Sequence, residues 1–152
     1  MSIPSALSGL VGIWKATHRL WLHPGNPVRE SEATATVALI AHNRFLHIAY
    51  TWSDDGPQDG LLLIGQVDQS GQINASWIDS WHNGDNLMNC VGHLTNDGAF
   101  SVKGSYAVPS GPDWGWRIVV KPEAETWRLI MYNITPEGGE HLAVEAVFSR
   151  QP

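Results

Sequence analysis

A carboxylate between two tryptophans is the feature of the sequence that most directly suggests chemistry. Asp79 lies two residues after Trp77 and two residues before Trp81. Side chains two apart in a β-strand share a face, so the two indoles would flank the carboxylate. Removal from water raises the pKa of an unpaired carboxyl group, which could then act as an acid, a base or a ligand anchor. The more common alternative is a structural carboxylate paired with an arginine inside the fold.

Arg117 and Glu145 are the next candidates. Simple alternation faces both outward, because Trp116 and Val144 alternate with them. If Arg117 points inward instead, its guanidinium could hold a ligand carboxylate through two parallel hydrogen bonds. A surface ion pair, which contributes little, is the alternative. A one-residue change of strand register inverts every side chain, so the sequence leaves both readings open.

The histidines and the cysteine give no pattern of a known centre. The seven histidines include neither His-x-His nor the His-x-x-x-His spacing of helical zinc sites, so we expect no metal. His47, which shares a face with Phe45, is the histidine that we include among the ligand-binding candidates. Cys90 is the single cysteine, which excludes an intramolecular disulfide and suggests a buried, inert thiol. The motifs of serine hydrolases, P-loop proteins and dinucleotide-binding folds are absent from the sequence.

The composition limits the class of protein. The chain has 152 residues, of which 43% are hydrophobic and 16% charged, so it should fold throughout as one domain, 1–152. A net charge of −6 disfavours nucleic acid and anionic membranes as partners. We find no stretch of about 20 apolar residues that would span a membrane. With one cysteine and no signal-peptide pattern, we expect a cytoplasmic protein.

Regularly spaced turn signals predict the elements that carry these residues. Clusters of Gly, Pro, Asn and Asp, such as Asn83-Gly84-Asp85 and Asn96-Asp97-Gly98, separate segments rich in β-branched and aromatic residues. Short connections between such segments favour a single antiparallel up-and-down β-barrel of ten strands, with a short helical turn in 2–10 that closes one end. The ten predicted strands are 11–21, 30–40, 44–53, 60–68, 72–82, 86–94, 99–106, 114–121, 126–134 and 140–150.

Two of the predicted strands, 44–53 and 126–134, are apolar on both faces. A barrel with a water-exposed exterior does not require this pattern. Burial of one outer face between two copies of the chain would explain it, so we predict a homodimer.

Several sequence pieces resemble known β-barrel families. Gly12-Ile13-Trp14 opens the first strand, and Gly-x-Trp at that position resembles the calycins, which include lipocalins and fatty-acid-binding proteins. The resemblance implies that Arg150 stacks on Trp14 at one barrel end. The chain is also similar to a bacterial family of calycin-like proteins of unknown function. The pieces that carry this similarity are Gly12-Ile13-Trp14, Arg44-Phe45-Leu46, Gly60 with Gly65, Ser76-Trp77-Ile78-Asp79-Ser80, Trp116-Arg117, Met131-Tyr132, and Glu145 with Arg150.

The resemblance supplies no reaction and no cofactor. Some ten-stranded relatives bind haem through a late histidine, and His141 is available, but the Gly-rich first strand of that group is missing here. We therefore expect no cofactor.

Three functions follow from the sequence. The first is the binding of a small hydrophobic or amphipathic molecule inside the barrel. Its walls would be Trp77, Trp81, Tyr106, Trp116 and Met131, with Asp79 and Arg117 as polar anchors. The second is an isomerase or hydrolase in which Asp79 or Glu145 is the base and His47 or Tyr132 its partner. The third is a dimeric interaction protein without an interior ligand.

Overall fold

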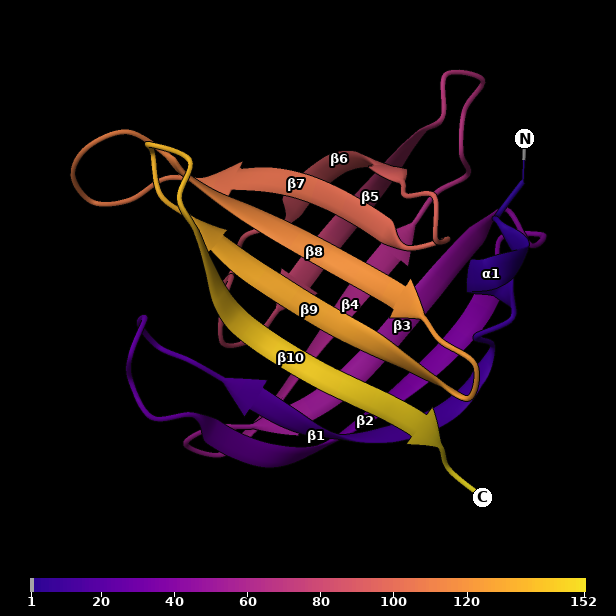
Figure 1. Cartoon of the computed structure of the whole chain (residues 1–152), viewed down its shortest axis with the longest axis horizontal. Helices are drawn as coiled ribbons and strands as arrows, with labels where there is room; N and C mark the ends of the chain where they lie inside the picture. The colour runs from indigo at the N-terminus through magenta and orange to yellow at the C-terminus, as the bar shows by residue number, and fades with distance from the viewer. Residues whose placement is uncertain (1) are drawn as a thin grey trace.

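A computed structural model describes residues 2–152 and shows a closed barrel of ten antiparallel strands (Figure 1). Each strand pairs with its neighbours in sequence, and β1 also pairs with β10, which closes the sheet. This topology confirms the predicted up-and-down barrel. The strands are β1 (Gly12–Leu20), β2 (Arg29–Ile40), β3 (Phe45–Ser53), β4 (Pro57–Ile64), β5 (Gln72–Asp79), β6 (Met88–Leu94), β7 (Phe100–Tyr106), β8 (Trp114–Pro122), β9 (Thr126–Ile134) and β10 (Glu140–Arg150).

Two strands, β4 and β5, differ from their predicted bounds by three residues or more at one or both ends. β4 begins at Pro57 and ends at Ile64, because Pro57 already pairs with Ser53 across the short hairpin. β5 ends at Asp79, three residues earlier than predicted. The Asp79 side chain accepts hydrogen bonds from the backbone N–H groups of Trp81 and His82. These contacts turn the chain away from the path of the strand.

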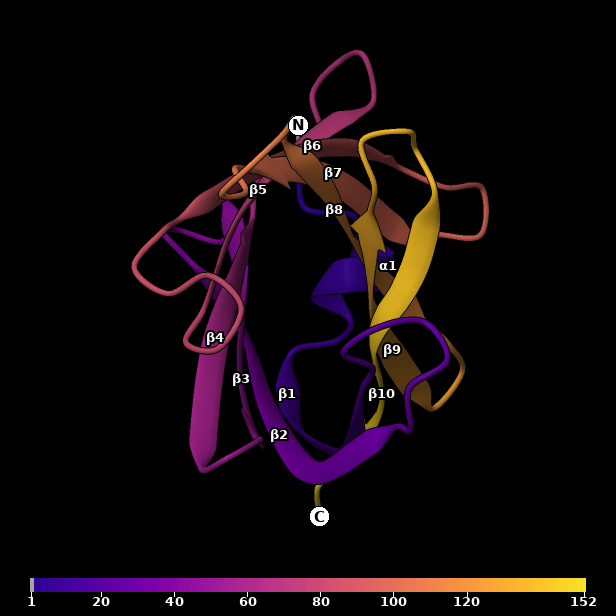
Figure 2. The same ribbon diagram turned by 90° about the vertical axis from the view of Figure 1, so that its left-hand side faces the viewer.

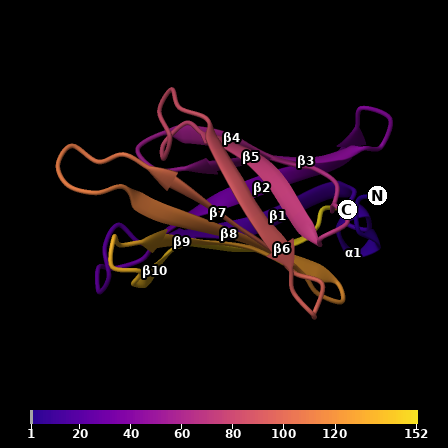
Figure 3. The same ribbon diagram turned by 90° about the horizontal axis from the view of Figure 1, so that it is seen from above.

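The helix α1 (Ser5–Ser8) closes one end of the barrel, as predicted for 2–10. Leu7 on this helix is fully buried, and Ile3 and Leu10 on either side also join the core. In the view along the barrel, α1 lies within the ring of strands (Figure 2). The loops β1–β2, β7–β8 and β9–β10 extend at the opposite end, which we call the distal end (Figures 1 and 3).

A stacked arginine fastens the two chain ends together beside α1. The Arg150 guanidinium lies 4.3 Å above the Trp14 ring and donates to backbone carbonyls at positions 9 and 11. The Trp14 indole N–H donates to the Leu10 carbonyl at 2.8 Å. Gly12 has a φ of 147°, and a Cβ there would lie 2.5 Å from Arg150 Nη1. The Gly-x-Trp pattern therefore leaves space for the arginine.

Side chains of alternate residues fill the barrel interior between α1 and the distal end. In this part of the core, Trp127 and Phe148 stack with ring centroids 4.4 Å apart, and Trp14 meets Trp127 edge to face. Both rings of the stacked pair are almost completely buried. The space next to α1 is thus packed core, and open space is found at the distal end.

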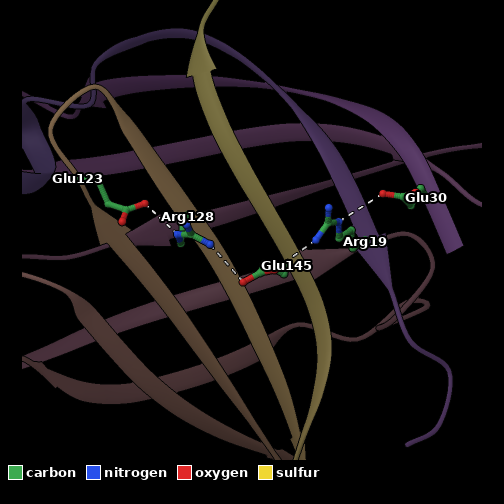
Figure 4. Close-up of polar contacts among 5 residues, drawn as sticks. All are labelled: Arg19, Glu30, Glu123, Arg128 and Glu145. Atoms are coloured by element: carbon green, nitrogen blue, oxygen red, sulfur yellow. Dashed lines mark hydrogen bonds and ion pairs between the residues drawn. The ribbon is translucent and has the colours of Figure 1, made fainter. Parts of the chain in front are cut away.

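Charged side chains form a row along the outer face of β9, β10, β1 and β2 (Figure 4). The row alternates in sign through Glu123, Arg128, Glu145, Arg19 and Glu30, with N···O distances of 2.8, 3.4, 4.0 and 3.3 Å. These groups are accessible to water, so each pair contributes little stability. Glu145 therefore lies outside the barrel as a member of this row.

Apolar side chains are exposed on the outer face of another part of the barrel. Phe45, Ile78 and Val91 are between 39% and 48% exposed. The homodimer inferred from the apolar outer positions stays a prediction. Light scattering would test it by measuring the molar mass in solution. In the described part of the chain, every helix is too short or too polar to cross a membrane.

Candidate ligand pocket at the distal end of the barrel

A pocket of about 310 Å³ lies at the distal end, where β1, β5, β7 and β9 end and where β8 and β10 begin. Its walls contain five of the eight tryptophans in the chain. These are Trp21, Trp77, Trp81, Trp114 and Trp116. Of residues 2–152, no Asp, Glu, Lys or Arg lines the pocket. The pocket is consequently aromatic and without a permanent charge.

The inner wall is a cluster of stacked rings. Trp77 and Trp116 lie nearly parallel, with centroids 5.4 Å apart and an interplanar angle of 7°. The His82 ring lies 5.1 Å from Trp116 and 4.7 Å from Trp81, which it meets edge to face. Because each ring is held by a neighbour, the wall offers flat apolar surfaces in fixed positions.

The Asp79 carboxylate organises this wall from behind. One oxygen accepts from the Tyr50 hydroxyl at 2.6 Å and from the Trp52 indole N–H at 3.2 Å. The other accepts from the backbone nitrogens of Trp81 and His82, at 2.9 and 3.0 Å. Asp79 is 3% exposed, and among the described residues no arginine or lysine pairs with it. Neutral donors therefore take the place of the arginine partner that the sequence suggested.

Tyr50 extends this network to the pocket. Its hydroxyl accepts a hydrogen bond from the Trp77 indole N–H at 2.9 Å while it donates to Asp79. Burial, and then the negative charge of Asp79, raise the Tyr50 pKa well above its usual value, so the hydroxyl keeps its proton. A Cβ at Gly60 would lie 2.4 Å from the Tyr50 hydroxyl. Glycine at that position thus makes room for the tyrosine.

Two histidines, the buried His18 and the partly buried His82, lie next to this network. His18 stacks on Trp52 at 4.3 Å, and His82 lies 5.6 Å from the same ring. Burial, and then repulsion from His82, lower the His18 pKa to about 4 against the opposing effect of Asp79. Burial also lowers the His82 pKa. Both imidazoles are thus neutral near pH 7.

The structure brings some of the predicted site residues together. Trp77, Trp81, Tyr106 and Trp116 line the pocket. Asp79 lies behind the wall and contacts it through hydrogen bonds.

The other predicted residues lie elsewhere. Met131 is buried in the core and does not line the pocket. His47, Arg117, Tyr132 and Glu145 lie on the outer face, because they alternate with inward residues on their strands. The structure therefore separates Asp79 from the two partners that an acid–base mechanism was expected to use.

Arg117 shows why the outer residues do not act in the pocket. Its guanidinium binds both oxygens of Glu140, with N···O distances of 2.7 and 3.0 Å. The same group lies 4.3 Å from the centre of the Tyr132 ring. The inward orientation considered for Arg117 is wrong, and simple alternation gave the correct face.

Sequence reasoning missed several residues of the pocket. Trp21 and His82 lie in loops, where alternation gives no direction, whereas Trp114 begins β8 and shares the face of Trp116. Asn133 lines the pocket from the end of β9, where it accepts a hydrogen bond from Tyr106. His18, which lies behind the wall, could have been found from the sequence, since it shares the inward face of β1 with Trp14 and Leu20.

The described residues contain no cluster of three or more His, Cys, Asp or Glu suited to a metal ion. Cys90 is buried, and burial raises its pKa to about 11, so the sulfur remains a protonated thiol. The pocket lining therefore offers aromatic rings and the hydrogen-bonding groups of tyrosine, asparagine, threonine and histidine side chains.

Comparison with known proteins places this geometry in a family. The chain is similar in fold to the crystal structure of Rv2717c from M. tuberculosis, with a TM-score of 0.64 and 15% sequence identity. The alignment covers 99% of this chain and 100% of that one. No curated protein matches the chain. The family model described as "Protein of unknown function (DUF1579)" matches residues 4–150, so the chain belongs to that family, as the sequence resemblance indicated.

Proposed function

We propose that this protein binds a small, mainly apolar molecule in the aromatic pocket at the distal end of the barrel. The observation that carries the proposal is the gathering of five tryptophans around one uncharged pocket. Small-molecule sites are typically concave, mainly apolar, and lined by a few fixed polar groups. The volume of about 310 Å³ suits a compact molecule of a few fused or linked rings.

The packing of the rest of the barrel supports this function. A core needs its aromatic rings buried, and the Trp127–Phe148 pair beside α1 meets that need. Trp81 and Trp114 are only partly buried, although burial of a large aromatic side chain is strongly favourable. Rings left incompletely covered around a hollow favour a surface that a ligand completes.

The acid–base alternative has less support. It required two titratable groups within hydrogen-bond reach of one open space. Asp79 already accepts four hydrogen bonds behind the wall, while His47, Tyr132 and Glu145 lie outside the barrel. The residues that were expected to carry acid–base chemistry are thus separated from one another, which favours binding.

The test is a titration with N-phenyl-1-naphthylamine, an uncharged probe whose fluorescence increases in apolar surroundings. We expect saturable binding of one probe per chain. Trp81→Ala removes one wall of the pocket and should weaken binding about tenfold, equivalent to about 1.4 kcal/mol.

Two control variants separate the pocket from the outer surface. Phe45→Ala removes an exposed ring from the outer face, and Arg117→Ala removes the cation that the sequence suggested as an anchor. Both should leave the affinity within about twofold of the wild type. Binding that is lost in Phe45→Ala and kept in Trp81→Ala would place the probe on the outer face and contradict the proposal.

A further inference from the structure

We propose that the ligand of the distal pocket is an uncharged, flat ring compound that accepts a hydrogen bond from the indole N–H of Trp116. This inference rests on the proposed binding function and specifies the class of molecule. It is carried by the hydrogen-bonding state of the wall and by the distribution of charge around the pocket.

Trp116 holds a buried donor that the protein does not use. The residue is 6% exposed and lines the pocket, and its Nε1, which neighbouring side chains cover, has no partner within residues 2–152. The neighbouring Trp77 indole donates to Tyr50, and the other buried indole nitrogen without a partner in the described chain, that of Trp127, lies in the packed core away from the pocket. A buried N–H without an acceptor costs free energy, and native structures rarely leave one unpaired. An indole can only donate, so its missing partner is an acceptor.

A second donor lies on the same wall. Tyr106 donates its hydroxyl hydrogen to Asn133 Oδ1 at 2.5 Å, which orients the amide with its oxygen toward the tyrosine. The Asn133 Nδ2 group is then a donor that this contact does not use. Both residues line the pocket. These two donors are thus suited to a carbonyl oxygen, an ether or a ring nitrogen.

The charges around the pocket favour a neutral ligand. An anion would need a cationic anchor, but in the described chain the lining contains three histidines (His23, His82 and His141) and no lysine or arginine, and Arg117 is paired with Glu140 outside. A cation would need a free anionic oxygen, yet Asp79 is not part of the lining and already accepts four hydrogen bonds. An ion entering this pocket would lose hydration without gaining a counter-charge.

Aromatic rings at the pocket surface favour a flat shape. Trp77 and Trp116 stack on each other and are almost fully buried, whereas Trp81 and Trp114 line the pocket and are only partly buried. A flat ring can stack on the partly buried pair and meet the other rings edge to face. A flexible aliphatic chain would use these surfaces less well.

Four bicyclic probes of similar size test the inference: naphthalene, quinoline, 1-methylquinolinium and 2-naphthoate. Their affinities would be measured by ligand-observed NMR titration at pH 8, where ordinary imidazoles are neutral. We expect quinoline to bind about tenfold more tightly than naphthalene, since it alone offers a neutral acceptor. Both ions should bind at least about tenfold more weakly than quinoline.

The Trp116→Phe variant shows whether the indole N–H causes the preference. It keeps an aromatic ring and removes the donor, so the ratio of the naphthalene and quinoline dissociation constants should fall from about ten toward about one. The ratio is informative even if the variant weakens both probes by changing the packing. Asn133→Leu is a second variant with the same readout, and near-UV circular dichroism confirms that each variant is folded.

Each other outcome has a defined meaning. Equal binding of naphthalene and quinoline to the wild type, while N-phenyl-1-naphthylamine still binds, would overturn this inference and leave the proposed function intact. Tightest binding of either ion would overturn it in the same way. Failure of all four probes and of N-phenyl-1-naphthylamine would overturn the proposed function itself.

Discussion

Replacement of Asp79 by asparagine tests the network that holds the pocket wall. The carboxylate accepts hydrogen bonds from Tyr50, Trp52, and the backbone of Trp81 and His82. An amide offers one oxygen, so its NH₂ group must face two of these four donors. A hydrogen bond to a charged acceptor contributes about 1.5–3 kcal/mol, so the loss of two should cost about 3–6 kcal/mol of unfolding free energy. For a chain of this size, that corresponds to a Tm decrease of at least about 6 °C.

Urea unfolding followed by circular dichroism measures this effect directly. Asp85→Asn is the matched control, because it removes the same charge from an exposed position in the β5–β6 loop. The control should change the unfolding free energy by less than about 0.5 kcal/mol. If Asp79→Asn were as stable as this control, the carboxylate would not be the buried acceptor described here, and the account of the wall would be refuted.

Two further predictions concern His18 and Arg150. The folded-state pKa of His18 is about 4, below its usual value of 6.5, so the unfolded chain binds the proton more readily between those values. Stability should therefore be complete above pH 6.5 and decrease by up to about 3 kcal/mol as the pH falls to about 4. His18→Phe should show a flatter pH profile in urea unfolding, and an unchanged profile would contradict the assignment. Arg150→Met removes the stacking on Trp14 and two hydrogen bonds to carbonyls, and should lower the unfolding free energy by about 1–3 kcal/mol. Equal stability of this variant in the same assay would show that the contact is dispensable.

The barrel could be predicted from the sequence because its turns have strong local signatures. Pairs such as Asn83-Gly84 and Asp97-Gly98 mark the connections, and Gly84 and Gly98 have φ values of 59° and 81°. Such turns define the hairpins without tertiary information. The end of β5 could not be predicted in this way, because it depends on side-chain hydrogen bonds of Asp79 to residues that follow it.

The pocket was only partly predictable for a related reason. Alternation gave the inward face of Trp77 and Trp116 on regular strands. It was not valid for Trp81, which reaches the pocket from a turn rather than from the strand that was predicted to continue there. Trp21 likewise follows the end of β1, and its direction depends on how the barrel closes.

The partners of buried polar groups could not be predicted at all. Asp79 was interpreted either as a pocket carboxylate or as the partner of an arginine, and it binds Tyr50 and Trp52 from β3 instead. These contacts follow from the pairing of β3 with β4 and of β4 with β5, in which Gly60 lies opposite both Tyr50 and Asp79. Strand register is a tertiary property, and alternation within one strand does not contain it.

A crystal structure of the protein soaked with quinoline is the most direct test of the distal pocket as a binding site. We predict density for the ring among Trp77, Trp81 and Trp116, with its nitrogen within about 3.2 Å of Trp116 Nε1. Rings of the protein itself filling that space, or quinoline bound only on the outer face, would contradict the account.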